Sequence, residues 1–144
     1  MRIRRAERKD LDRVYELVCL LEDERLDYKG FEKAYGYALD HDVMYVLEEE
    51  RILAFLHMRI SPQLCRADDI CEILELVVDD EYRNRGYGNL LLEQVKEYCS
   101  QKDIGIIEVL SSSYREGAHR FYERNGFINT GYRFFNKEWR GKKR

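Results

Sequence analysis

Residues 83–88, RNRGYG, place two glycines and two arginines where an apolar run at 76–78 gives way to a helical repeat of leucines. Glycine lets the backbone approach a ligand closely and adopt dihedral angles that other residues avoid. A helix start carries unpaired N–H groups and a partial positive charge, so a glycine turn at this point forms a cradle for an anion, commonly phosphate. Arg83 and Arg85 add full positive charge beside it. The segment therefore predicts a pyrophosphate site.

Known phosphate-binding patterns narrow the choice of ligand. The P-loop pattern G-x-x-x-x-G-K-[ST] is absent, which argues against a nucleoside triphosphate. The dinucleotide pattern G-x-G-x-x-G fails at Leu91, where its third glycine would stand. The alternative interpretation of the segment is a glycine-rich turn with two solvated arginines.

The elements that would position this segment alternate only partly between strand and helix. Apolar residues at helical spacing predict helices, and alternating or continuous apolar runs predict strands. We therefore expect a mixed sheet covered by helices, not a doubly wound parallel sheet. Strands are expected at 1–6, 43–47, 52–60, 70–78, 104–110, 127–128 and 132–135, with helices at 8–22, 29–39, 88–100 and from a capping box at Ser113–Glu116 to Arg124, ended by Asn125-Gly126.

Composition limits the classes of function. The chain of 144 residues is 44% hydrophobic and 37% charged, which fits a single domain, 1–144. Its net charge of −3 argues against a nucleic-acid partner, which requires a basic face. No apolar run approaches the roughly 18 residues of a membrane span, and the N-terminus lacks the apolar core of a signal peptide. We expect a cytoplasmic protein with no membrane partner.

The cysteines and histidines give no metal-binding pattern. The three histidines lie far apart in the sequence, and no two cysteines stand in a C-x-x-C pair. In a reducing compartment the cysteines are expected to act as small apolar residues. We predict no metal; the four cysteines are Cys19, Cys65, Cys71 and Cys99.

A second motif follows downstream of the glycine segment. Residues 118–127 read A-x-x-F-Y-x-x-x-G-F, and residues 83–88 fit the pattern [Q/R]-x-x-G-x-[G/A]. In this order and at this separation, the two motifs resemble those of the GNAT superfamily of N-acetyltransferases. The resemblance implies an α/β fold with a mixed, mostly antiparallel sheet of six to seven strands. In that fold the fourth and fifth strands splay apart, and about four helices flank the sheet.

A narrower resemblance also appears. Residues 30–31, 40–45, 72–78 and 118–122 are similar to the aminoalkylphosphonate N-acetyltransferases. This likeness is patchy through the half of the chain that would hold the acceptor.

The resemblance implies that acetyl-CoA is the co-substrate. The pantetheine arm would add like an extra strand along the splayed fourth strand. The N–H of Val78 would then stabilise the oxyanion formed at the thioester carbonyl. The implied cofactor-binding residues are Leu76, Val77 and Val78 on the strand and Arg83, Asn84, Arg85, Gly86, Tyr87, Gly88 and Asn89 at the helix start.

The resemblance also implies direct attack by an amine through a tetrahedral intermediate. Tyr122 would protonate the departing thiolate, since a phenol and a thiol have pKa values of about 10 and about 8.5. Glu72 or Glu75 would remove the ammonium proton, although strand alternation puts them on opposite faces unless a bulge intervenes. Structural interpretations remain for each: Tyr122 as a core aromatic beside Phe121, and one of the glutamates facing solvent.

Arg115 departs from the family pattern. Many relatives carry an asparagine at this position, seven residues ahead of the tyrosine, where it helps to bind the CoA arm. An arginine here could reach a CoA phosphate or could simply be solvated at the helix start.

The acceptor is the least specified part of the reaction. An acidic and aromatic cluster suits a cationic amine, but it also fits a solvated helix face. A phosphonate-bearing amine would instead need cationic contacts, from His57, Arg59 or Arg133. The members of the acidic cluster are Glu22, Asp23, Glu24 and Asp27, with Tyr28, Phe31 and Tyr35 beside them.

The leading hypothesis is an enzyme that acetylates a primary amine of a small molecule. A peptide or protein acceptor is the alternative within the same reaction class. A non-catalytic sensor of acetyl-CoA is the alternative from another class, although a sensor would need neither Tyr122 nor strand carboxylates. A homodimer is also open, because strands between Phe127 and Trp139 are able to pair across subunits.

Overall fold

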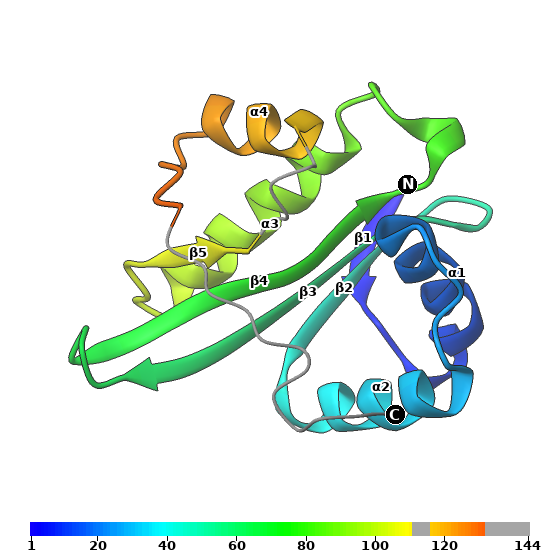
Figure 1. Ribbon diagram of the computed structural model, residues 1–144, viewed down its shortest axis with the longest axis horizontal. Coiled ribbons are helices and arrows are strands. Elements are labelled where there is room, and N and C mark those ends of the chain that lie inside the picture. The colour runs from blue at the N-terminus through cyan, green and yellow to red at the C-terminus, as the bar shows by residue number, and fades with distance from the viewer. Residues whose placement is uncertain (111–115, 132–144) are drawn as a thin grey trace, which may run out of the picture. The chain divides into compact units, whose positions relative to one another are not determined.

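The computed structural model describes residues 1–110 and 116–131. Contacts divide the chain into two compact units, Met1–Leu110 and Ser111–Arg144. The first unit holds a sheet with helices, and the second holds one described helix (Figure 1).

The sheet has five strands among the described residues, in the order β1-β2-β3-β4-β5. The first three neighbouring pairs are antiparallel and β4 with β5 is parallel, which confirms a mixed, mostly antiparallel sheet. The expected six to seven strands is wrong for this sheet, because 127–128 is not a strand. Residues 132–135 lie outside the described part of the chain. The strands are β1 Arg2–Arg5, β2 Val43–Glu48, β3 Ile52–Gln63, β4 Asp68–Val78 and β5 Ile107–Val109.

Strand β5 is shorter than the expected 104–110. The turn that closes the preceding helix uses the first of these residues, since Asp103 has a left-handed φ of 59° and the Ile104 N–H donates to the Cys99 carbonyl at 2.8 Å. Backbone groups committed to a helix end cannot also join a strand ladder. The strand therefore begins only at Ile107.

Helices cover both faces of the sheet. On one face, apolar side chains of α1 and α2 pack on Met44, Val46, Phe55 and Val77 from β2, β3 and β4. The opposite face, which carries the alternate residues of the strands, packs against α3. The expected helices at 8–22, 29–39 and 88–100 are confirmed within one or two residues, apart from a first turn of 3₁₀ helix, and the last helix ends at Arg124 as expected. The capping box expected at its start, with Ser113, lies outside the described residues. The helices are η1 Arg8–Asp10, α1 Leu11–Glu22, α2 Tyr28–His41, η2 Asp80–Tyr82, α3 Tyr87–Gln101 and α4 Glu116–Arg124.

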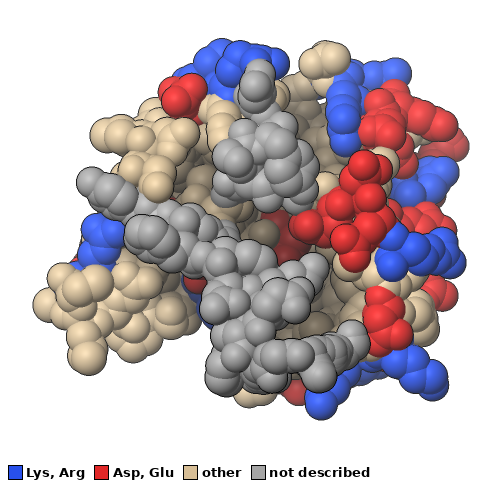
Figure 2. All heavy atoms as spheres, viewed as in Figure 1, with Lys and Arg blue, Asp and Glu red and all other residues tan. Residues whose placement is uncertain are grey.

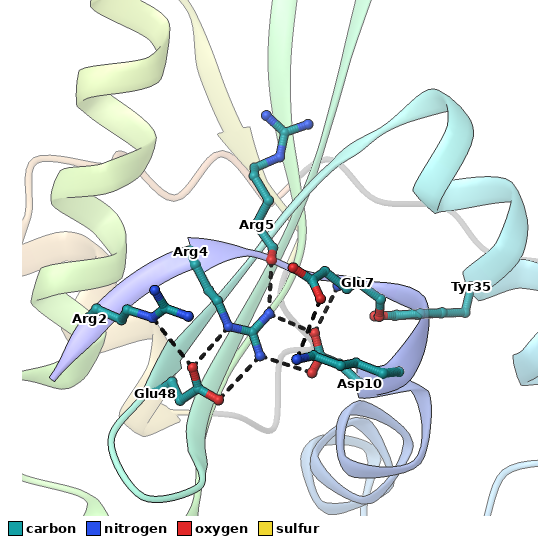
Figure 3. A network of polar contacts seen from close by, with 8 residues as sticks. Arg2, Arg4, Arg5, Glu7, Asp10, Tyr35 and Glu48 are labelled. Carbon is teal, nitrogen blue, oxygen red and sulfur yellow. Dashed lines mark hydrogen bonds and ion pairs between the residues drawn. The ribbon is translucent and has the colours of Figure 1, made fainter.

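An ionic cluster fixes the outer edge of the sheet to the start of α1 (Figure 3). The Arg4 guanidinium on β1 donates two hydrogen bonds to Asp10, at 2.9 and 3.0 Å, and two to Glu48 on β2, at 2.9 and 3.3 Å. Burial alone would raise the pKa of Asp10, but these bonds and the Glu7 N–H outweigh it and lower the pKa. We call Arg4, Asp10 and Glu48 the edge cluster.

Candidate active site

A β-bulge interrupts the pairing of β3 with β4. His57 pairs with Glu75, and the next residue of β3, Met58, pairs with Ile73, so Leu74 is an extra residue on β4. A bulge bends its strand and shifts the alternation of side chains by one residue. The bend lies in the middle of the strand that was expected to be splayed.

The bulge brings both predicted carboxylates to one face. Glu72 stands opposite Arg59 and Glu75 stands opposite His57. Residues directly opposite each other in an antiparallel pair share a face, and so do residues two apart in one strand. Glu72 and Glu75 therefore lie on the face that α1 and α2 cover, with a basic residue opposite each.

A chain of hydrogen bonds runs across this face. The His57 ring bonds Glu75 through Nδ1, at 2.6 Å, and Asp42 through Nε2, at 2.8 Å. Arg59 donates two hydrogen bonds to the same Asp42, from Nε to Oδ1 and from Nη2 to Oδ2, both at 2.9 Å. The exposed fraction of the side chain rises from 1% at Asp42 and 13% at His57 to 29% at Glu75. We call these four residues the His57 cluster.

The cluster shifts the titration of its central members. Burial by itself would lower the pKa of His57, but the hydrogen bonds and charges of Glu75 and Asp42 outweigh it and raise the pKa above its ordinary value. Burial would raise the pKa of Asp42, and the bonds from Arg59 and His57 instead lower it. Both shifts favour the charged forms, His57 as a cation and Asp42 as an anion.

Sequence reasoning considered His57 and Arg59 only as contacts for a phosphonate, and it missed Asp42. Asp42 lies between α2 and β2, whereas His57 and Arg59 lie on β3, and no short motif joins the three. The one local signal is their spacing, because His57 and Arg59 are two apart on a strand and so share a face.

Beyond the bulge, the edge of β4 that faces away from β3 is no longer paired with β5. Strand β5 pairs with β4 only as far as Ile73 and Val109, whereas β4 continues to Val78. The expected splaying of the fourth and fifth strands fits this arrangement.

Two backbone N–H groups of β4 point toward the opened side. The N–H of Asp79 donates to the carbonyl of Leu53 in β3, at 2.9 Å. In an antiparallel pair, successive residues direct their N–H groups alternately toward and away from the partner strand. Val78 and Leu76 therefore direct theirs away from β3, as an added strand would require.

The glycine segment forms the start of α3. Gly86 is its N-cap with a φ of 84°, and Asn84 also has a left-handed φ of 64°. The Leu90 N–H makes the first bond of the helix, to the Gly86 carbonyl at 3.1 Å. The helix itself therefore does not use the N–H groups of Tyr87 and Gly88, as an anion cradle requires.

The two arginines of the segment are both exposed. Arg83 pairs with Asp80 at 2.9 Å, and its Nε donates to the Val78 carbonyl at 3.4 Å. The Arg85 guanidinium lies over the ring of Tyr82, 5.1 Å from the centroid. Arg83 thus links the open edge of β4 to the approach to α3.

Tyr122 lies in the second unit, where the end of α4 holds its ring. The Phe127 N–H donates to the Tyr122 carbonyl at 3.0 Å, and the Gly126 N–H donates to the Glu123 carbonyl at 3.1 Å, with Gly126 at a φ of 92°. This pairing is a Schellman helix end, which confirms the expected end at Asn125-Gly126. The Tyr122 ring packs edge-on against Phe121 and Phe127, at 5.2 and 5.5 Å, and is 8% exposed. The downstream motif thus fixes one buried tyrosine ring.

The acidic cluster proposed for the acceptor has structural uses. Asp27 caps α2 by accepting the Gly30 N–H at 2.8 Å, and Tyr35 is buried with its hydroxyl donating to the Glu7 carbonyl at 2.7 Å. Tyr28 donates to Asp12, which raises the pKa of Tyr28 to about 12. On the face of the molecule drawn in Figure 2, acidic side chains gather on the side where Figure 1 shows α1 and the β2–β3 turn.

Two further findings concern the described residues alone. No group of three or more His, Cys, Asp or Glu side chains in them is arranged to hold a metal ion. No helix in them combines the length and the apolar character needed to cross a membrane.

Comparison with known proteins gives one family and one fold. The family model described as "Acetyltransferase (GNAT) family" matches residues 8–127. The aminoalkylphosphonate N-acetyltransferase of Salmonella typhimurium is 33% identical over 135 residues, which cover 92% of this chain and 88% of that protein.

Solved structures share the fold at lower identity. A candidate acetyltransferase from Agrobacterium tumefaciens superposes with a TM-score of 0.81 at 24% identity, over 94% of this chain and all (100%) of that one. A predicted acetyltransferase from Clostridium acetobutylicum, solved with acetyl-CoA, superposes with a TM-score of 0.77 at 17% identity, over 96% and 97% of the two chains.

Proposed function

This chain belongs to the GNAT family of acetyltransferases, and from that premise we propose that it moves the acetyl group of acetyl-CoA to a primary amine of a small molecule. An aminoalkylphosphonate is the first candidate acceptor, because the Salmonella relative carries that name and is similar along most of its length. The observation that carries the proposal is the opened edge of β4, with two carboxylates on one face and the glycine cradle of α3 at its end.

The cradle and the edge suit the two parts of CoA. The N–H groups at the start of α3 would hold the pyrophosphate, with Arg83 and Arg85 adding charge. The pantetheine arm would lie along β4 as an added strand, bonded to the N–H groups of Leu76 and Val78. Val78 is the donor that the family resemblance implies for the thioester carbonyl, and Leu76 offers the same kind of donor two residues earlier on the strand.

The base must take one proton from the substrate ammonium, whose pKa is about 10. We assign this role to Glu72, directly or through a water molecule. His57 already engages Glu75, whereas among the described residues no hydrogen bond holds the Glu72 carboxylate. Glu72 is therefore able to turn toward an incoming amine.

The remaining steps follow from the reaction. The amine nitrogen attacks the thioester carbon, a C–N bond forms, and a backbone N–H of β4 stabilises the oxyanion. The C–S bond then breaks, and Tyr122 donates its phenolic proton to the thiolate that leaves. The nitrogen loses its second proton as the amide forms, the tyrosinate regains a proton through solvent, and Glu72 releases the proton that it took to solvent. The products are the N-acetylated amine and free CoA thiol.

The test is thiol release from acetyl-CoA across aminoalkylphosphonates, polyamines, aminoglycosides and short peptides. We expect turnover on aminoalkylphosphonates and a loss of at least about 100-fold in Glu72→Gln. Glu93→Gln is the matched control, since Glu93 is an exposed glutamate on α3 that pairs with Lys96. Turnover on peptides alone would show that the acceptor is a peptide and not a small-molecule amine. Tight acetyl-CoA binding without thiol release from any amine would favour a sensor of acetyl-CoA over an enzyme.

A further inference from the structure

We infer that Asp42, His57 and Glu75 form a proton-holding chain in which a doubly protonated His57 positions Glu75 beside the β4 bulge for acetyl transfer. The inference rests on the proposed function and deepens it by adding a positioning residue, His57, to the reaction. Neither Glu75 nor His57 is assigned the proton transfer itself, which stays with Glu72.

The geometry fixes the protonation state of the ring. Each ring nitrogen of His57 lies within 2.8 Å of a carboxylate oxygen. A carboxylate is an acceptor only, so each nitrogen must carry a hydrogen for both bonds to form. A neutral imidazole has one hydrogen and would turn a lone pair toward one of the two carboxylates.

The two ends of the chain differ in what else holds them. Arg59 binds Asp42 through two parallel bonds, and Asp42 also ends α2, so this end is fixed without His57. Glu75 is the more exposed end, and among the described residues its side chain hydrogen-bonds only to His57. Loss of the proton on Nδ1 therefore releases Glu75, whereas Asp42 stays bound to Arg59 whichever proton the ring loses.

Stability alone gives little reason for such a cluster at a bend in the sheet. Replacement of a buried ionic group by apolar residues of similar volume is often neutral or stabilising. The edge cluster does have an evident structural task, because it ties β1 and β2 to the start of α1. The His57 cluster instead reaches toward the partly exposed Glu75, next to Glu72.

The pH dependence of His57 depends on the charges that surround it. Asp42 faces it from the junction of α2 and β2, and Glu75 faces it from β4. Arg59 and Glu72 form the next pair on the same face of the sheet. The hydrogen bonds to Asp42, and to a smaller extent the charge of Glu72, raise the pKa of Arg59. Among the described residues, no hydrogen bond or ion pair joins a side chain of α1 to His57. The adjacent carboxylates are therefore the dominant charges.

The first experiment measures kcat and KM for the amine, from about pH 6 to about pH 9, in wild type and His57→Gln. The ratio of the two kcat values cancels the titrations of the substrate and of Tyr122. We expect the kcat of wild type to exceed that of His57→Gln by about 10-fold or more below neutral pH. This ratio should decline as pH rises through the raised pKa of His57. KM for acetyl-CoA should stay the same. Glu48→Gln, in the edge cluster, should lower the melting temperature without a pH-dependent ratio.

The second experiment needs no activity. Nitrogen NMR of the His57 ring should show that the ring loses its second proton above pH 6.5 in wild type and at a lower pH in Glu75→Gln. A ring that is neutral below pH 6.5, or a kcat ratio that is constant with pH, would overturn the inference. A wild type that acetylates no amine would instead overturn the proposed function, and the NMR titration would still decide the protonation of His57.

Discussion

Gly86 permits a direct test of the cradle at α3. The residue has a φ of 84°, and a methyl group added there would meet no other atom within 4 Å. Gly86→Ala therefore adds only backbone strain, about 1–2 kcal/mol for a residue with a side chain in the left-handed region. Gly105→Ala is the matched control, since its methyl group also meets open space and its φ lies outside that region.

The strain must appear in one of two measurements. If Gly86→Ala keeps the cradle, the free energy of unfolding falls by about 1–2 kcal/mol, which lowers the melting temperature by about 2–8 °C. If residue 86 instead leaves the left-handed conformation in the free protein, acetyl-CoA must restore that conformation when it binds. The affinity for acetyl-CoA then falls by about 5–30-fold. Denaturant unfolding followed by circular dichroism and calorimetric titration with acetyl-CoA give both values.

The control removes the strain and keeps the added methyl group. Gly105→Ala should be as stable as wild type or up to about 1 kcal/mol more stable, because alanine restricts the unfolded chain. A Gly86→Ala protein with wild-type stability and wild-type affinity would refute the assignment of a left-handed glycine at the cradle.

Three further predictions concern the reaction and the His57 cluster. Tyr122→Phe should lower kcat by about 100-fold with little effect on acetyl-CoA binding, as thiol release and calorimetry would show, whereas an unchanged kcat would reduce Tyr122 to a packing residue. Asp42→Asn should lower the free energy of unfolding by about 3–5 kcal/mol, since it leaves His57 and Arg59 without their shared anion, and urea denaturation measures this. The folded state raises the pKa of His57, so the contribution of this residue to stability is complete below about pH 6.5 and is lost as pH rises through the folded pKa. Over that pH window, the free energy of unfolding of wild type should therefore fall relative to that of His57→Gln.

The sequence was sufficient for elements whose pattern is local. Helical spacing located α1, α2 and α3, and the two glycines located the start of α3 because a left-handed residue is needed there. The end of α4 was predictable for the same reason, since Gly126 takes a left-handed φ. Each of these features depends on residues within a few positions of one another.

The positions of features that depend on strand pairing could not be predicted from local spacing. Leu74 is an apolar residue in an apolar strand, and nothing distinguishes it from its neighbours until β3 pairs with β4. The bulge then decides that Glu72 and Glu75 share a face, where alternation alone predicts opposite faces. The His57 cluster likewise needs Asp42 to come beside β3, a contact that no local spacing encodes.

The length of β5 and the expected number of strands were wrong for a related reason. The apolar run at 104–110 reads as one strand, but its first residues complete the turn after α3. The pair 127–128 is apolar as well, yet Phe127 folds back on Tyr122 as part of the helix end. In both segments, backbone hydrogen bonds that complete a helix end form in place of the hydrogen bonds of a strand.

The most direct test of the account is the initial rate of CoA thiol release with an aminoalkylphosphonate, in wild type, Glu72→Gln and Glu93→Gln. Mass spectrometry of the same samples identifies the acetylated product. The account predicts one N-acetylated amine for each thiol released, a fall of at least about 100-fold in Glu72→Gln, and a wild-type rate in Glu93→Gln. A wild-type rate in Glu72→Gln would contradict the assigned base, and thiol release without an acetylated amine would contradict acetyl transfer to this acceptor.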